Sequence, residues 1–163
     1  MSEPGTVTVT VTRTVPDAAD MRDLGVRLAG LLRPGDLLVL TGDLGAGKTT
    51  LTQGIGEGLK VRGPITSPTF VIARVHPSLC GGPPLVHVDA YRLGGFAELD
   101  DLDLDASADA SVTVVEWGEG LAEGLADARL EMIISRGDGS TEERAVKITG
   151  VGERWAGLAR ELH

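Results

Sequence analysis

The residues with the clearest chemical potential form one glycine-rich stretch. It reads Gly42-Asp43-Leu44-Gly45-Ala46-Gly47-Lys48-Thr49 and fits the pattern G-x-x-x-x-G-K-[ST]. Glycine lets the main chain approach a phosphate closely, so that successive N–H groups can surround the anion. Lys48 adds a positive charge for the β- and γ-phosphates, and the hydroxyl of Thr49 can reach a Mg²⁺ ion. The pattern therefore predicts a nucleotide-phosphate loop.

The segments on either side of this loop have the character that phosphate binding requires. Residues 36–41 form a short apolar run typical of a buried strand. After the loop, Leu51, Ile55 and Leu59 recur every four residues, as on one face of a helix. A helix that begins at the loop directs the positive end of its dipole at the anion. An ordinary glycine turn is the alternative, and the flanking strand and helix argue against it.

Two further predicted strands end in an acid, at Asp89 and at Glu116. Ligands of α/β sheets bind beyond the carboxyl ends of the strands. If the strand of Glu116 runs parallel to the strand before the loop, its carboxylate emerges beside Thr49. Each acid alone fits a solvated turn equally well, but two acids beside a phosphate loop favour Mg²⁺ binding or water positioning. His87 alternates with Asp89 on the same strand face, and a structural role is expected for it.

The segment Ser67-Pro68-Thr69-Phe70 is a candidate switch. Proline limits its conformations, and the hydroxyls of Ser67 and Thr69 flank the proline. Such a loop can close on a γ-phosphate and release it after hydrolysis. A plain turn that leads into a strand is the alternative.

The first strand and helix position the loop from its N-terminal side. Residues 6–13 alternate threonine with valine, which predicts a strand with one exposed face at or near a sheet edge. Apolar residues recurring between positions 21 and 31 mark an amphipathic helix, which Pro34 should end. In the helix after the loop, Gly54 and its neighbouring glycines each cost about 1 kcal/mol relative to alanine. That helix must therefore be stabilised by packing on the sheet.

The rest of the chain predicts a single domain over residues 1–163, with residues 1–5 disordered. The remaining elements are a strand reaching Val75, a strand over 85–89 that pairs antiparallel with it, a strand over 111–115, a hairpin of 130–135 with 144–149, and a terminal helix marked by Trp155, Leu158 and Leu162.

Charge and cysteine content restrict the class of protein. The formal net charge is −9, and residues 97–131 contain 11 acids against the single base Arg129. This stretch repels phosphate, which argues against a general nucleic-acid binder, and it fits either a solvated face or a docking surface for a basic partner. The single cysteine, Cys80, excludes an intramolecular disulfide. With no apolar run long enough for a membrane span, a cytoplasmic protein is expected.

Four signatures together resemble the bacterial tRNA threonylcarbamoyladenosine biosynthesis ATPase family, TsaE. They are the loop over 42–50, Ser67-Pro-Thr-Phe70, His87-Val-Asp-Ala-Tyr-Arg-Leu93 and Val115-Glu-Trp117. The resemblance implies an α/β, P-loop NTPase-type three-layer fold whose central parallel sheet is extended by antiparallel strands. It also implies an ATPase that uses ATP/ADP and Mg²⁺ and works with the threonylcarbamoyl transferase TsaD and its paralogue TsaB. Such a protein allows repeated modification of adenosine 37 in tRNAs that read ANN codons. The excess of acids over bases separately predicts that this chain acts on tRNA only indirectly.

The resemblance also implies roles for individual residues. Lys48, Asp89 and Glu116 are the catalytic candidates, and Thr49, Glu116 and Asp89 are the candidate Mg²⁺ ligands. The nucleotide-binding candidates are Gly42, Gly45, Ala46, Gly47, Lys48, Thr49, Thr50, Ser67, Thr69 and Trp117. The segment from Val15 to Ala18 is expected to border the adenine, with Arg144 on its other side.

Three other functions compete with this interpretation. A small phosphotransferase needs a lid with catalytic arginines, but only Arg62, Arg74 and Arg92 lie between the loop helix and the acidic stretch. A binding module that uses nucleotide only to stabilise its fold would not hydrolyse ATP. The sequence argues against a GTPase, because the chain contains no asparagine for an Asn-Lys-x-Asp base reader and no Asp-x-x-Gly.

Overall fold

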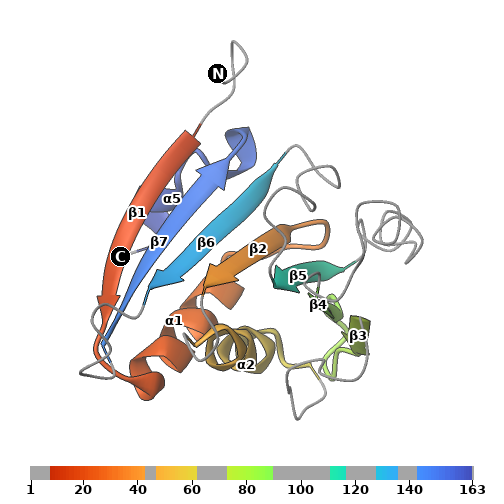
Figure 1. The fold of residues 1–163 in the computed structure, drawn as a ribbon. Coiled ribbons are helices and arrows are strands. Elements are labelled where there is room, and N and C mark those ends of the chain that lie inside the picture. Colours follow the sequence, from red (N-terminus) through yellow and green to blue (C-terminus); the bar gives the residue numbers. More distant parts are fainter. Residues whose placement is uncertain are drawn as a thin grey trace.

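The computed structural model describes residues 8–42, 47–61, 73–89, 111–116, 128–135 and 143–162. These residues form a seven-stranded sheet in the order β1-β7-β6-β2-β5-β4-β3 (Figure 1). None of the described helices has the length and apolar character needed to cross a bilayer.

The middle of the sheet is parallel and its sides are antiparallel. The parallel strands are β6 (Arg129–Ser135), β2 (Leu37–Gly42), β5 (Val112–Glu116) and β4 (Leu85–Asp89). The antiparallel strands are β7 (Arg144–Val151) and β1 (Thr8–Val15) on one side and β3 (Ala73–His76) on the other. This arrangement confirms the predicted parallel sheet with antiparallel extensions.

The strand β1 lies at the sheet edge, as its alternating sequence predicted. Its even-numbered threonines are exposed, whereas Val11 and Val15 are buried. The antiparallel pairing of β6 with β7 confirms the predicted hairpin, and the pairing of β3 with β4 confirms the second one. The strand that the sequence predicted to reach Val75 extends one residue further, because His76 is the last residue of β3.

The helix α1 (Ala18–Ala29) contains most of the apolar positions that predicted it, but it ends earlier than the sequence predicted. Asp17 caps it, because its side chain accepts a hydrogen bond from the backbone N–H of Asp20 at 2.9 Å. The helix stops at Ala29 and Gly30 is its C-cap, so Leu31 lies beyond it and Pro34 is not the residue that ends it. A tight turn replaces the last predicted helical turn, with the N–H of Leu31 bonded to the carbonyl of Leu28.

The helix α2 (Lys48–Leu59) packs closely against α1, which the prediction of packing on the sheet alone did not include (Figure 1). A Cβ atom at Gly54 would lie 2.1 Å from the carbonyl oxygen of Arg22, and one at Gly25 would lie 2.3 Å from that of Leu51. Only glycine fits at these two contacts. The glycines that lower the helix propensity of α2 therefore allow the two backbones to meet.

One face of the sheet carries the main apolar core. Neighbouring partners in one row across the strands are Val11, Ile148, Met132 and Leu40, and all four belong to the buried cluster that includes α1 and α2. On the opposite face, buried valines also line the central strands, at positions 39, 86, 88 and 115. The central strands are thus buried on both faces, as a three-layer fold requires.

The C-terminal segment completes the main core as a 3-10 turn, η3 (Glu153–Trp155), followed by the short helix α5 (Leu158–Glu161). Trp155, Leu158 and Leu162 are buried, which confirms that the end of the chain covers the core. It does so in two short pieces, whereas the sequence predicted one helix.

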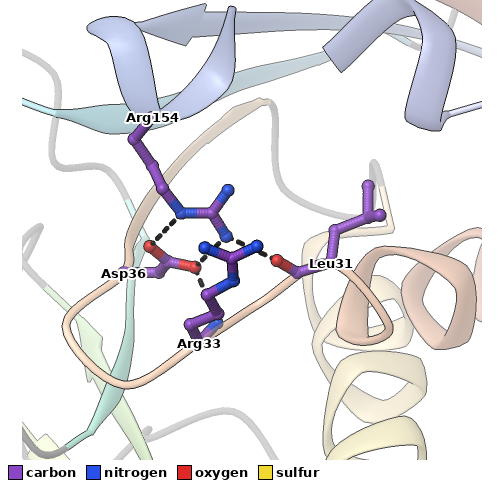
Figure 2. Close-up of polar contacts among 4 residues, drawn as sticks. All are labelled: Leu31, Arg33, Asp36 and Arg154. Atoms are coloured by element: carbon purple, nitrogen blue, oxygen red, sulfur yellow. Dashed lines mark hydrogen bonds and ion pairs between the residues drawn. The ribbon is translucent and has the colours of Figure 1, made fainter. Parts of the chain in front are cut away.

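A polar cluster fastens this C-terminal segment to the turn between α1 and β2 (Figure 2). The guanidinium of Arg154 donates to both carboxylate oxygens of Asp36, at 3.2 and 2.9 Å, and to the carbonyl of Leu31 at 2.5 Å. The backbone N–H of Arg33 also donates to Asp36, at 2.7 Å. Arg154 lies over the ring of Trp155, 4.0 Å from its centroid. The cluster therefore ties together segments that are far apart in the sequence.

Candidate functional site

The elements around the glycine-rich loop are the ones that the sequence predicted. The strand β2 ends at Gly42 and the helix α2 begins at Lys48. Gly47 is the N-cap of α2 and has a left-handed φ of 113°, a conformation that favours glycine. A Cβ at Gly47 would lie 3.2 Å from the Cε of Met21, so α1 contacts the end of the loop. Residues 43–46, including Gly45 and Ala46, lie outside the described residues.

Lys48 connects the two ends of the loop. Its side chain is buried, and its Nζ donates to the carbonyl oxygen of Gly42 at 2.6 Å. Thr49 and Thr50 follow in the first turn of α2 and are partly exposed. The positive end of the helix dipole and the Lys48 ammonium thus lie together at the carboxyl end of β2, where an anion is favoured.

The two predicted acids lie side by side at this end of the sheet. The strand β5 is parallel to β2, with Glu116 the partner of Leu40, so the condition for placing Glu116 near the loop is met. Asp89 at the end of β4 is in turn the register partner of Glu116. The backbone therefore brings both acids to one edge, although the side chain of Asp89 is outside the described part of the chain.

Glu116 is hydrogen-bonded to a histidine that the sequence predicted to be merely structural. The Nε2 of His87 lies 2.8 Å from the Oε2 of Glu116, and their side chains are 0% and 5% exposed. The sequence placed His87 on the strand face of Asp89 but gave no sign of contact with Glu116. The His-x-Asp alternation indicates contact between His87 and Glu116 only when β4 and β5 are known to be neighbouring strands.

The donors that the structure describes suit Mg²⁺. Mg²⁺ prefers oxygen ligands and is commonly held by one or two protein groups together with phosphate and water oxygens. Glu116 supplies a carboxylate whose only hydrogen bond from a described residue is to Oε2, and Thr49 supplies a hydroxyl. Within the described ranges, no group of three or more His, Cys, Asp or Glu side chains forms a preassembled metal cluster. The donors therefore fit an ion that arrives with a nucleotide.

A groove beside α1 includes part of the predicted adenine segment. It has a volume of about 530 Å³, and its lining includes Val15, Pro16 and Leu24. Arg144 is the register partner of Val15, so the two sides predicted for the adenine are adjacent. Base binding in this groove stays a prediction.

Several predicted site residues fall outside the described ranges. They are Gly45, Ala46, Ser67, Thr69 and Trp117. Most of the acidic stretch over 97–131 is outside as well. Their roles stay predictions.

Comparison with known proteins gives concordant matches. The family model described as threonylcarbamoyl adenosine biosynthesis protein TsaE matches residues 15–146. The tRNA threonylcarbamoyladenosine biosynthesis protein TsaE of Streptomyces coelicolor is 68% identical over 139 residues, which cover 83% of this chain and 94% of the relative. The protein of the same name from Bacillus subtilis is 43% identical over 136 residues, covering 82% of each chain.

A solved structure agrees with the sequence matches. The crystal structure of Bacillus subtilis YdiB superimposes with a TM-score of 0.76 at 32% identity, and the match covers 96% of this chain and 95% of that one. The family match spans the glycine-rich loop sequence, both acids and His87. The fold, the loop and these matches confirm the resemblance: the chain belongs to the TsaE family of threonylcarbamoyl adenosine biosynthesis proteins.

Proposed function

We propose that this protein is a Mg²⁺-dependent ATPase that supports the formation of threonylcarbamoyladenosine at position 37 of tRNAs reading ANN codons. The observation that carries the proposal is that the start of α2 at Lys48 follows the carboxyl end of β2, and that Glu116 lies at the same end of its parallel neighbour β5. This arrangement supplies an anion site and a carboxylate at the same edge of the sheet. Family membership supports the pathway, because the curated relatives are named for it.

In this proposal the residues of the loop hold the phosphates. Lys48 and the N–H groups at the start of α2 neutralise the phosphate oxygens, and Thr49 and Glu116 hold the ion. Bound Mg²⁺ would stabilise the charge that develops on the transferred phosphoryl group. Asp89 is the candidate for orienting the attacking water, and Ser67 and Thr69 for sensing the γ-phosphate.

The proposed partners are the transferase TsaD and its paralogue TsaB, in the cytoplasm. Hydrolysis would reset this complex for another round, and the ATPase itself would not transfer the threonylcarbamoyl group. We propose that the isolated chain does not bind tRNA tightly, because its 24 acids outnumber its 15 bases and phosphate contacts need clustered Lys and Arg. Filter binding near physiological salt checks this, and a sub-micromolar affinity without partners would contradict it.

The decisive experiment measures multiple-turnover tRNA modification and ATP hydrolysis by the protein together with TsaD, TsaB, tRNA and Mg²⁺. Lys48→Ala should stop both tRNA modification and ATP hydrolysis. Lys147→Ala is the matched control, because it also removes one ammonium, at an exposed position, and should leave both activities unchanged. ATP consumption in which the γ-phosphoryl group is transferred to an acceptor other than water would support the phosphotransferase alternative. Binding without any hydrolysis would support the nucleotide-stabilised module.

A further inference from the structure

The contact between His87 and Glu116 is unusual for the interior of a sheet. His87 lies on β4 next to β5, where its register partner is Val114. Its side chain is fully buried, and its Nε2 is 2.8 Å from the Oε2 of Glu116. A buried position between apolar strands would ordinarily be filled by an apolar side chain.

The direction of this hydrogen bond follows from chemistry. A carboxylate can only accept, so Nε2 of His87 carries the proton and donates to Oε2 of Glu116. The other ring nitrogen, Nδ1, is buried and has no hydrogen-bond partner in the described structure. His87 therefore leaves one of its two polar atoms unsatisfied, and the bond to Glu116 is the one polar contact that the described residues give it.

The same hydrogen bond constrains Glu116. The backbone of Glu116 is fixed by its pairing with Leu40 and Asp89, but its side chain has three rotatable bonds. A donor at Oε2 selects one orientation of the carboxylate and compensates for its burial. It also leaves Oε1 without a described partner.

We propose that His87 is a positioning residue for the nucleotide-bound metal ion. It acts through Glu116, by holding Oε2 so that Oε1 remains for the ion, and it does not itself touch the nucleotide. This inference rests on the proposed function, because it needs Glu116 to be a Mg²⁺ ligand. Groups that hold a metal ligand in this way commonly change metal affinity by about 10- to 100-fold when they are removed.

The test measures metal binding without relying on catalysis. Mn²⁺ replaces Mg²⁺, and the electron paramagnetic resonance signal of free Mn²⁺ is followed during titration of the full chain with a non-hydrolysable ATP analogue. His87→Leu removes the N–H donor and fills the same space with an apolar side chain of similar size. His87→Gln retains an N–H donor near the position of Nε2. Thr113→Val is the matched control, because it changes a buried polar side chain of β5 on the opposite sheet face.

We expect His87→Leu to weaken Mn²⁺ binding in the ternary complex by about tenfold. His87→Gln should restore most of the affinity, and Thr113→Val should match the wild type. Binding of the nucleotide alone, measured in EDTA, should be the same in all variants. In a Glu116→Gln background, changing His87 should have no further effect on the metal. If His87→Leu does not yield folded protein, His87→Asn takes its place, because its shorter amide withdraws the donor from Oε2.

Three results would overturn the inference. They are unchanged Mn²⁺ affinity in the donor-removing variant, an equal loss of nucleotide affinity in EDTA, and a full His87 effect in the Glu116→Gln background. A wild-type chain that binds no Mn²⁺ with the nucleotide would instead overturn the proposed function and this inference with it. A wild type that binds Mn²⁺ while the donor-removing variant binds it equally well overturns the inference alone.

Discussion

Two buried carboxylates lie at opposite ends of the parallel strands, and their surroundings differ. Asp36, just before β2, is 8% exposed, and Glu116, the last residue of β5, is 4% exposed. Asp36 accepts hydrogen bonds on both oxygens, from Arg154 and from the backbone of Arg33. Glu116 accepts a single hydrogen bond from the described residues, from His87.

The difference separates a structural acid from an acid available for chemistry. A carboxylate whose oxygens are already occupied by a guanidinium and an N–H has little capacity left for a ligand. One that keeps an oxygen without a protein donor can coordinate a metal ion. The polar cluster of Asp36 and Arg154 at the amino end therefore fastens segments of the fold together, whereas in the proposed function the carboxyl end, with Lys48 and Glu116, binds the nucleotide and the ion. The predictions below test this division.

The largest effect is expected from Lys48→Ala at the carboxyl end. Loss of the ammonium should lower partner-dependent ATP hydrolysis by at least about 100-fold, as for loss of a charge-stabilising donor. The melting temperature should change little, because the ammonium contacts a loop carbonyl. A steady-state phosphate-release assay and a thermal melt measure the two quantities. Wild-type hydrolysis in this variant would remove the loop from the mechanism.

Arg154→Ala should have its main effect on the free energy of unfolding. It leaves Asp36 buried with the backbone N–H of Arg33 as its one donor among the described residues, which costs about 2–4 kcal/mol. Urea denaturation of this variant and of the exposed Arg160→Ala control measures the difference. ATP hydrolysis well below the melting temperature should stay at the wild-type rate. If Arg154→Ala had a wild-type free energy of unfolding but reduced ATP hydrolysis, the amino end would act in catalysis and not in stability, which contradicts the proposed division.

Glu116→Gln should show the opposite pattern. The amide keeps the size of the side chain but loses the charge that favours a metal ion, so hydrolysis should fall by about tenfold or more. The free energy of unfolding should change by less than about 1 kcal/mol, because the amide oxygen can still accept the hydrogen bond from His87 while a buried charge is removed. Glu153→Gln, at an exposed position of η3, is the control. Parallel activity assays and urea melts would show whether stability and activity separate.

The smallest expected effect is a change in tryptophan fluorescence when nucleotide binds. The chain has two tryptophans, with Trp155 in the polar cluster at the amino end and Trp117 directly after Glu116 in the sequence. Nucleotide addition should change the fluorescence of a Trp155→Phe variant and leave that of Trp117→Phe nearly constant. A flat signal in Trp155→Phe, with binding established by calorimetry, would place Trp117 away from the nucleotide.

The sequence predicted those features that depend on neighbouring residues. The strand and helix that flank the glycine-rich loop, the edge strand β1 and both hairpins follow from local spacing and turn residues, and the structure confirms them. The contacts that define the two ends of the sheet join distant residues. His87 and Glu116 are 29 positions apart, and Arg154 and Asp36 are 118 apart. Local spacing specifies the partners of a hairpin but not which strands distant in the sequence become neighbours, so these contacts were not predicted.

The errors near α1 have a related cause. Pro34 cannot continue a helix, but a chain can leave the helix earlier when its carbonyls find other donors. Here the carbonyl of Leu31 is bonded to Arg154, which comes from the far end of the chain. The glycines of α2 were interpreted as weak points because propensity describes a helix without neighbours. Their contribution to stability depends on α1, because the absence of a side chain lets the backbone of α1 approach α2.

The contact between α1 and α2 has a mechanical consequence. Most helix pairs meet through side chains, which can change rotamer and allow one helix to slide past the other. At Gly25 and Gly54 the backbones are in direct contact, so no side chain lies between them that could change rotamer and let one helix slide past the other. The helix α2 has 12 residues and is about 18 Å long, and its first residue is Lys48. Because the two backbones are in contact, a movement that tilts the N-terminal end of α2 must also move α1.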